Sequence, residues 1–277
     1  MYKIGSSLEF MNNEWQFLKD DLYKSDNRFD DVSQYIERYE FLKKFDDVFQ
    51  YSKKFLEIPL CDIKRMYRGV PKKVDLKNYG RMVPNAEFSN RHNRMNPPGR
   101  VFIYLGVMPT QKGNSEDIEK NFIINTIAKE LRAVKGQDLT ICRFESNTQK
   151  KIIDLTGDST LPLIESEVDK LIDKKIKSLA RVRSGKVKVE PYVHEILTKL
   201  YINIFNNDNI FKPIEIDEER AYEYAPFQLI ASYIEQNGYA GIKYRSTVDR
   251  KGTNLVLFNT EDVTLIPETM EHIIYSI

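Results

Sequence analysis

The sequence is poor in the residues that build disulfide scaffolds and metal centres. Among its 277 residues it has only two cysteines and three histidines. Cys61 and Cys142 lie far apart, and Cys142 sits in an apolar run, where a free thiol usually behaves as a small buried hydrophobe. His92, His194 and His272 are widely spaced and match no metal-ligand pattern. We therefore expect no disulfide framework and no bound metal.

Long hydrophobic runs are also missing. No stretch approaches the roughly 18 consecutive apolar residues that a membrane-spanning helix needs. Residues 1–15 lack the charged start and the apolar run of a signal peptide. We therefore expect a soluble, cytoplasmic protein that does not enter a membrane.

The charge is balanced, and glycine-rich phosphate loops are absent. Lys and Arg total 42 and Asp and Glu total 41, which gives a formal net charge of +1. Such a balance provides no global attraction to nucleic acid or to anionic membranes, so any such binding needs a local patch. No Gly-x-Gly-x-x-Gly or Gly-Lys-Ser/Thr motif appears, which argues against Rossmann and P-loop enzymes.

The first part of the chain predicts helices only. Hydrophobic residues make up 41% of the sequence, enough for a sizeable core. One stripe of apolar residues recurs at three- and four-residue steps: Val32, Tyr35, Ile36, Tyr39, Leu42, Phe45 and Phe49. We interpret residues 1–58 as a helical N-terminal extension. A scaffold role is favoured, with autoinhibition, homo-oligomerisation or signal sensing as the alternatives.

Strands and helices are mixed in residues 59–277. Residues 101–107 and 138–144 are short runs rich in β-branched and aromatic residues, which predict buried strands. Between them, residues 121–134 predict a helix that is closed by Gly136.

A helical, basic segment follows at about residues 160–220, and we interpret it as an insertion. Apolar stripes predict one helix over residues 164–180 and another that begins near Pro191. The basic residues of this segment are Lys170, Lys174, Lys175, Lys177, Arg181, Arg183, Lys186 and Lys188. Asp169 and Asp173 interrupt them, so a solvated helix face is favoured over a nucleic-acid contact.

The C-terminal third has the clearest pattern. A helix with one apolar face stops at Gly238, and an extended segment follows at residues 241–246. Residues 249–252 form a turn, and residues 254–258 predict a buried strand. Helices and strands in mixed order, without regular βαβ alternation, indicate the α+β class.

Several segments in this order resemble the blocks of the RES-domain family, over roughly residues 60–260 with gaps. The segments are MYRGV (66–70), NRMNPPGRVFIYLG (93–106), TIAKELRAVKGQDLTICRFE (126–145), KIIDLTG (151–157) and the C-terminal block at 224–258. Their joint presence carries the resemblance more than any single block. The arginine, glutamate and serine that give the family its name correspond to Arg68, Glu130 and Ser246.

The resemblance implies a fold like that of ADP-ribosyltransferase toxins, with a mixed β core and flanking helices, and NAD as substrate. It implies cleavage of the nicotinamide–ribose bond by hydrolysis or phosphorolysis, within an NAD-binding catalytic domain at residues 59–277. Many members are the toxin half of a bacterial toxin–antitoxin pair. The resemblance therefore makes the protein a candidate growth-arresting toxin or defence effector and an antitoxin protein a candidate partner.

The residue types suit this chemistry. Arg68, with Arg94 as a candidate helper, would grip the pyrophosphate through paired hydrogen bonds. Tyr104 would stack on nicotinamide, and Glu130 would stabilise the oxocarbenium-like ribose left when nicotinamide departs. Ser246 would hydrogen-bond the nicotinamide amide or a ribose hydroxyl. For each residue taken alone, an ordinary structural role is the commoner interpretation.

Two further residues, Gln228 and Asn254, are candidates for polar support of NAD. Glu116 or Glu119 is the alternative to Glu130, because the interval after Tyr104 is long for this family. Glu130 is preferred for its Ala-x-Glu-Leu-Arg context.

Two other functions remain as alternatives. A protein ADP-ribosyltransferase would share the fold and NAD but would transfer ADP-ribose to a side chain. A non-enzymatic module would bind a partner through the helical N-terminus or RNA through the basic insertion. The sequence leaves open the acceptor (water, phosphate or protein), the activating signal and the oligomeric state, but it favours NAD cleavage because every expected polar residue type is present.

Overall fold

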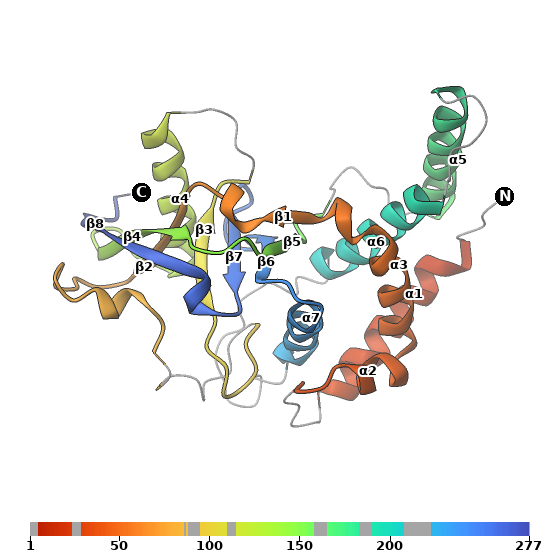
Figure 1. Ribbon diagram of the computed structural model, residues 1–277, viewed down its shortest axis with the longest axis horizontal. Helices are drawn as coiled ribbons and strands as arrows, with labels where there is room; N and C mark the ends of the chain where they lie inside the picture. The colour runs from red at the N-terminus through yellow and green to blue at the C-terminus, as the bar shows by residue number, and fades with distance from the viewer. Residues whose placement is uncertain are drawn as a thin grey trace.

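The computed structural model describes residues 5–23, 29–85, 87, 95–109, 115–157, 165–182, 190–207 and 223–276. Within them, an eight-stranded mixed sheet is flanked by helices and preceded by an all-helical N-terminal segment (Figure 1). The α+β prediction is therefore confirmed. No helix in these ranges is long and apolar enough to cross a membrane.

The strands form one sheet in the order β1-β5-β6-β7-β3-β2-β4-β8. They are β1 (Glu57–Pro59), β2 (Met66–Val70), β3 (Ile103–Val107), β4 (Asp138–Ser146), β5 (Lys151–Asp154), β6 (Gly241–Arg245), β7 (Thr253–Leu257) and β8 (Val263–Ile274). β5 pairs with β6 in parallel, and the other paired strands run antiparallel. The central position of β7 places a late segment of the sequence in the middle of the sheet, whereas β8, the last strand, forms one edge.

The helices fall into two groups in space. They are α1 (Gly5–Leu22), α2 (Ser33–Arg38), α3 (Glu40–Ser52), α4 (Glu116–Glu130), α5 (Glu165–Val182), α6 (Glu190–Asn207) and α7 (Ala225–Gln236). In Figure 1, α4 lies beside β3, and α1, α2, α3, α5 and α6 gather beyond the opposite end of the sheet, with α7 between them and the strands. α6 begins one residue before Pro191, as the sequence predicted.

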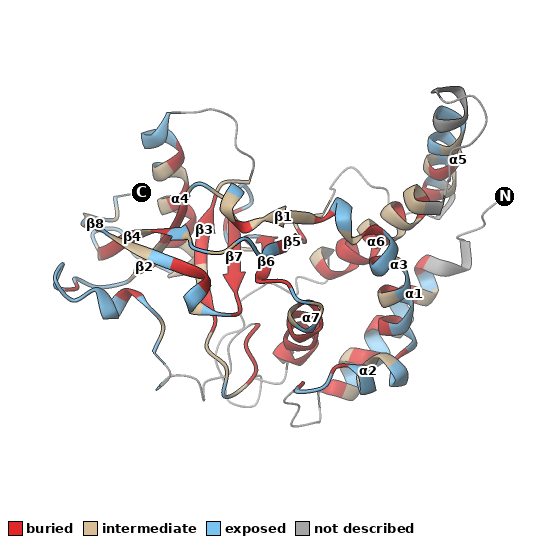
Figure 2. Ribbon diagram, in the orientation of Figure 1, coloured by how far each residue is buried: buried red, intermediate tan, exposed pale blue. Residues whose placement is uncertain are grey.

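The N-terminal helices share one hydrophobic core with α6, α7 and the sheet. The ring of Trp15 in α1 lies 5.1 Å from Phe41 of α3, 5.3 Å from Phe205 of α6 and 6.5 Å from Phe227 of α7. The same buried cluster reaches Tyr244 of β6, and Figure 2 marks the buried residues of α7, β3 and β7 in red. The apolar stripe of α2 and α3 therefore packs within the chain, and a homo-oligomer through these helices stays a prediction.

Two glycines let α4 lie directly on the sheet. A Cβ atom at Gly106 of β3 would lie 2.8 Å from side-chain atoms of Ile123 and Ile127, and one at Gly69 of β2 would lie 2.6 Å from Ile127. Real Cβ atoms do not approach so closely, so any side chain at either position would push the helix away. The two glycines thus fix how far the end of α4 stands from β2 and β3.

The end of α4 differs from the predicted one. The helix stops at Glu130 rather than Val134, and Gly136 lies in the turn that follows. Arg132 takes a positive φ of 53°, and the amide of Ala133 donates to the carbonyl of Ala128 at 2.9 Å. This is the Schellman pattern, with arginine where glycine is usual. Glu130 is consequently the last residue of the helix.

β2 and β3 separate after a short pairing. They are matched only at Met66↔Val107 and Tyr67↔Gly106. β2 stays paired with β4 up to Val70, and β3 stays paired with β7 along its whole length. The split therefore opens at Arg68, the next residue of β2.

The predicted strands in the C-terminal third and at residues 101–107 and 138–144 are confirmed within one or two residues at each end. Gly238 ends α7 with a φ of 87°, as predicted. β1, β2, β5 and β8 were not predicted as strands. Arg183, Lys186 and Lys188 of the basic segment lie outside the described residues.

Candidate active site

Glu130 is held by side chains from two other elements. Its Oε1 atom accepts a hydrogen bond from Ser246 Oγ at 2.8 Å and another from Asn254 Nδ2 at 2.5 Å. Ser246 follows β6, Asn254 lies in β7, and both side chains belong to residues only 6% exposed. A carboxylate at the C-terminal end of a helix is disfavoured by the helix dipole. The two donors offset that cost and fix the orientation of the carboxylate.

Ser246 uses all of its hydrogen-bonding capacity within the protein. Its hydroxyl donates to Glu130 and accepts from the amides of Val248 at 3.3 Å and Asp249 at 3.0 Å. A hydroxyl has one proton and two lone pairs. A direct bond from Ser246 to a substrate, as the sequence suggested, would therefore require it to release one of these partners.

Tyr104 is fixed through its hydroxyl. The hydroxyl donates to Asn96 Oδ1 at 2.8 Å and accepts from the amide of Met95 at 3.1 Å. Gln228 of α7 donates to the carbonyl of Asn96 at 3.4 Å, so it supports the same loop. Asn96 and Gln228 are both buried. The loop and α7 thus hold the phenol hydroxyl, and the half-buried ring packs against the large hydrophobic cluster.

Tyr104 and Asn254 lie on the same face of neighbouring strands. Asn254 pairs with Gly106, and Tyr104 pairs with Val256. The two side chains are therefore diagonal neighbours, with Cα atoms about 7–8 Å apart. This register brings the tyrosine close to the group that holds Glu130.

Arg68 lies at the split between β2 and β3 and is poorly satisfied. Its Nη1 donates to the carbonyl of Tyr104 at 3.4 Å, while its Nε atom is buried and has no hydrogen-bond partner. Burial lowers the pKa of the guanidinium to about 10, so it stays charged at neutral pH. Within the described part of the chain, no ion pair neutralises it. Such a cation is suited to receive an anion from outside the protein.

Arg68 and Glu130 make no hydrogen bond or ion pair with each other. Tyr67 packs against α4 and Gly69 lies against it, so the alternation of β2 turns Arg68 to the other face of the strand. A ligand that engages both groups would therefore have to pass through the split between β2 and β3.

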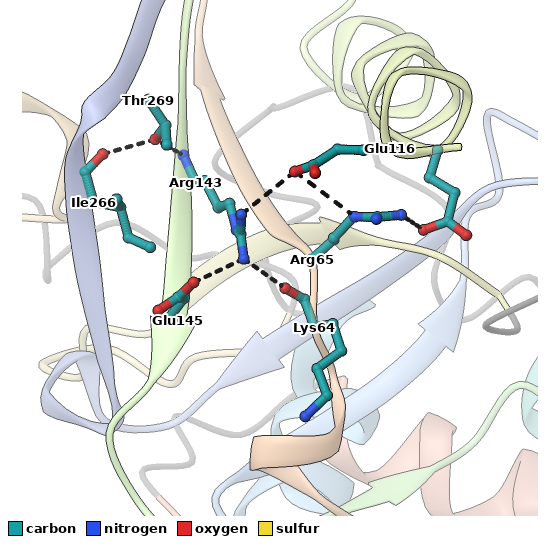
Figure 3. A network of polar contacts seen from close by, with 8 residues as sticks. Lys64, Arg65, Glu116, Arg143, Glu145, Ile266 and Thr269 are labelled. Carbon is teal, nitrogen blue, oxygen red and sulfur yellow. Dashed lines mark hydrogen bonds and ion pairs between the residues drawn. The ribbon is translucent and has the colours of Figure 1, made fainter. Parts of the chain in front are cut away.

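The alternative carboxylates lie at the opposite end of α4. Glu116 contacts Arg143 Nη1 at 3.5 Å and Arg65 Nε at 4.0 Å, and Glu119 pairs with Arg65 (Figure 3). The guanidinium of Arg143 also donates to the carbonyl of Lys64, and the backbone amide of Arg143 donates to Thr269 Oγ1. Both glutamates thus belong to an ion-pair network that joins α4 to β2, β4 and β8.

One candidate falls outside the described residues, and two residues that hold the candidate site were missed. Arg94 lies in a segment that the structure does not describe. Asn96 and Asp249 were not singled out, because a Pro/Gly-containing loop and an Asp-Arg-Lys-Gly turn look like ordinary chain reversals in sequence. The only signals available were a polar residue beside Pro97 and an aspartate at the start of the turn that ends at Gly252.

Residues 193–277 match the family model of the RES domain. The RES resemblance is confirmed there. The matched residues include Gln228, Ser246 and Asn254, whereas Arg68, Tyr104 and Glu130 precede them. The match begins in α6, inside the segment that the sequence assigned to an insertion, so the domain boundaries stay predictions.

Other comparisons add little to the RES match. No curated protein matches the sequence. A solved structure titled "Crystal structure of the M.tuberculosis MbcT-MbcA toxin-antitoxin complex" matches with 12% identity over 83% of this chain and 92% of that chain, at a TM-score of 0.34. A likeness at this TM-score carries no argument about fold or function.

Proposed function

We propose that the protein binds NAD and cleaves its nicotinamide–ribose bond by hydrolysis or phosphorolysis. The observation that carries this proposal is the anchoring of Glu130, whose Oε1 atom receives donors from both Ser246 and Asn254. The RES match over residues 193–277 supports it, since that family is associated with NAD.

The anchored carboxylate suits the reaction. Departure of nicotinamide leaves positive charge on the ribose, as in glycoside cleavage. A carboxylate already fixed in place stabilises that charge without reorganising during the reaction. In this proposal Glu130 provides the stabilisation, and Ser246 and Asn254 act by keeping its orientation.

The unsatisfied guanidinium suits the pyrophosphate. Arg68 keeps its charge, has a buried Nε without a partner, and lies at the strand split. Two phosphate oxygens can accept parallel hydrogen bonds from one guanidinium. Because Arg68 and Glu130 do not touch, they would engage different parts of the extended dinucleotide, the pyrophosphate and the nicotinamide ribose.

Tyr104 completes the proposed site. Its hydroxyl is held by Asn96 and Met95, so the ring is the part that would stack on nicotinamide. Gln228 contributes through the Asn96 loop. The scheme uses no metal ion. Among the described residues, no group of three or more His, Cys, Asp or Glu side chains could bind one.

The test is the release of nicotinamide from NAD by the purified protein, with and without phosphate. The matched variant is Glu130→Gln, which keeps the size and one acceptor oxygen but removes the charge. We expect NAD loss in the wild type and almost none in the variant, which should still fold. A dependence on phosphate would assign phosphorolysis. Equal turnover by both proteins would remove Glu130 from the site.

We further propose that the activity arrests growth and that an antitoxin protein restrains it in the cytoplasm. NAD loss is harmful to any cell, so the enzyme would need restraint. Expression of wild type and of Glu130→Gln in a bacterial host tests this: growth arrest with the wild type alone supports it, and equal growth contradicts it.

A further inference from the structure

Asp249 lies in the turn between β6 and β7 and reaches back to α4. Its Oδ2 atom accepts from Thr126 Oγ1 at 2.8 Å, and its Oδ1 atom accepts from Lys129 Nζ at 3.1 Å. Thr126 and Lys129 occupy the last turn of the helix, four residues and one residue before Glu130. Asp249 is only 7% exposed. The contact is therefore an internal tie between the turn and the end of the helix.

The same turn carries the group that holds Glu130. The amide of Asp249 donates to Ser246 Oγ at 3.0 Å, and Ser246 Oγ donates to Glu130. The carbonyl of Asp249 also receives the amide of Gly252 at 2.8 Å. Asp249 thus contacts α4 through its side chain and Ser246 through its backbone, which closes a ring of contacts around Glu130.

Close packing makes the ring stiff. A Cβ atom at Gly252 would lie 2.4 Å from Thr126 Cγ2 and 2.6 Å from Thr126 Oγ1. The turn therefore approaches the side chain of Thr126 more closely than a residue with a Cβ atom would allow. Neither can shift relative to the other without breaking several contacts at once.

Asp249 stays ionised in this setting. Burial alone would raise the pKa of Asp249, but hydrogen bonds from Thr126 and Lys129 and the charge of Lys129 hold it below its ordinary value of 3.8. The amide of Lys251 also donates to it. The tie to Lys129 is therefore present throughout the neutral pH range.

We propose that Asp249 is a positioning residue that sets the place of the Glu130 carboxylate through Ser246 and the last turn of α4. It touches no substrate in this scheme. The inference rests on the proposed function, because its consequence for rate requires that Glu130 acts on NAD. A displacement of about 1 Å at a reacting group can lower a rate by about a hundredfold.

The opposite end of α4 offers a matched control. Arg65 pairs there with Glu119, which is 5% exposed, much as Lys129 pairs with Asp249. Glu119 lies eleven residues before Glu130, or roughly 16 Å along a helix that rises 1.5 Å per residue. Loss of that pair should weaken the fold without moving Glu130.

The experiment compares Asp249→Asn with Arg65→Met. For each we would measure kcat and KM for NAD, the melting temperature, and hydrogen exchange of the amides at residues 246–250. We expect Asp249→Asn to lower kcat about tenfold to a hundredfold, with KM changed less than about threefold. Arg65→Met should lower the melting temperature but leave kcat within about twofold.

Two further variants test for a merely structural role. Lys129→Arg keeps the cation and should retain most of the rate, whereas Lys129→Met should reproduce the fall in kcat. An equal fall of kcat in Asp249→Asn and Arg65→Met would overturn the proposal, because stability alone would then explain both.

Hydrogen exchange separates this inference from the proposed function. Without nicotinamide release by the wild type, the proposed function fails, but the amides of Val248 and Asp249 still report on the tie. Faster exchange there in Asp249→Asn alone supports positioning. Unchanged exchange in that variant contradicts the positioning role, whether or not the wild type releases nicotinamide from NAD.

Discussion

Glu130 and Arg68 carry the two opposite charges of the candidate site, and the protein supports them differently. Glu130 receives two donors on one oxygen, from residues almost closed to solvent. Arg68 has one long contact to a backbone carbonyl and a buried Nε without a partner. A group that acts in the reaction gains from being fixed beforehand. A group that binds a ligand contributes more to affinity when its hydrogen-bond donors have no partner in the free protein, because the ligand then provides the acceptors.

The comparison predicts opposite effects on stability. Around Glu130, catalysis and folding depend on the same hydrogen bonds, so both should weaken together. At Arg68 the fold tolerates an unpaired buried charge, so its removal should weaken binding but strengthen the fold. The following variants test that contrast, in order of decreasing effect.

Removal of an anchor should have the largest effect. Asn254→Leu is close in shape but cannot donate to Glu130. We expect kcat for NAD cleavage to fall about 10²- to 10³-fold and the free energy of unfolding to fall by about 1–3 kcal/mol. Steady-state kinetics and urea denaturation measure the two quantities. Unchanged kcat in a destabilised variant would show that the anchor serves the fold alone.

Removal of the Arg68 guanidinium should lower the affinity for NAD and raise the free energy of unfolding. In Arg68→Met, the loss of two charged hydrogen bonds should weaken NAD binding about a hundredfold. The free energy of unfolding should rise by about 1–2 kcal/mol, since a buried unpaired charge has gone. Calorimetric titration and denaturation provide both values. A destabilised Arg68→Met protein would contradict the contrast with Glu130.

Removal of one hydroxyl should have a smaller effect. Tyr104→Phe keeps the ring but leaves Asn96 Oδ1 and the amide of Met95 without that partner. We expect a loss of about 1–2 kcal/mol in unfolding free energy, with the rate reduced only a few-fold. Tyr104→Leu, which removes the ring as well, should reduce the rate much further. Equal rates in the two variants would argue against stacking.

Protonation of Asp249 in acid should have the smallest effect on stability. Because the pKa of Asp249 is lower in the folded protein than the ordinary 3.8, its ionisation stabilises the fold above that pH. That contribution is lost as pH falls below about 3.8 toward the folded pKa. Denaturation from pH 7 to pH 2 should therefore show a shallower acid loss for Asp249→Asn than for the wild type. Parallel curves would contradict this assignment.

The sequence predicted the parts of the fold that repeat a local pattern. Apolar runs at 101–107 and 138–144 became strands, and Gly238 ends α7 as predicted. β8 escaped prediction because Pro267 interrupts it, at the point where its register with β4 shifts. α4 begins five residues before the predicted start, because its first turn is polar and shows no apolar stripe.

From the sequence, the residues of the candidate site could be predicted only one by one, and their contacts with one another could not. Glu130, Ser246 and Asn254 were chosen separately, and the structure brings them into one hydrogen-bonded group. No local pattern could show that Asp249 returns to Thr126, or that Asn96 holds Tyr104. These contacts depend on how the sheet places distant turns beside a helix end, which is a property of the whole chain.

The central place of β7 has a consequence for synthesis. Ser246 and Asn254 follow Glu130 by 116 and 124 residues, and β7 must enter between β3 and β6. A chain still emerging from the ribosome can form α4 early, but its last residue stays without its anchors until the final strands arrive. Sheets closed by such distant segments form slowly. If the protein cleaves NAD as proposed, that activity would begin only after the last strands have been made and have joined the sheet.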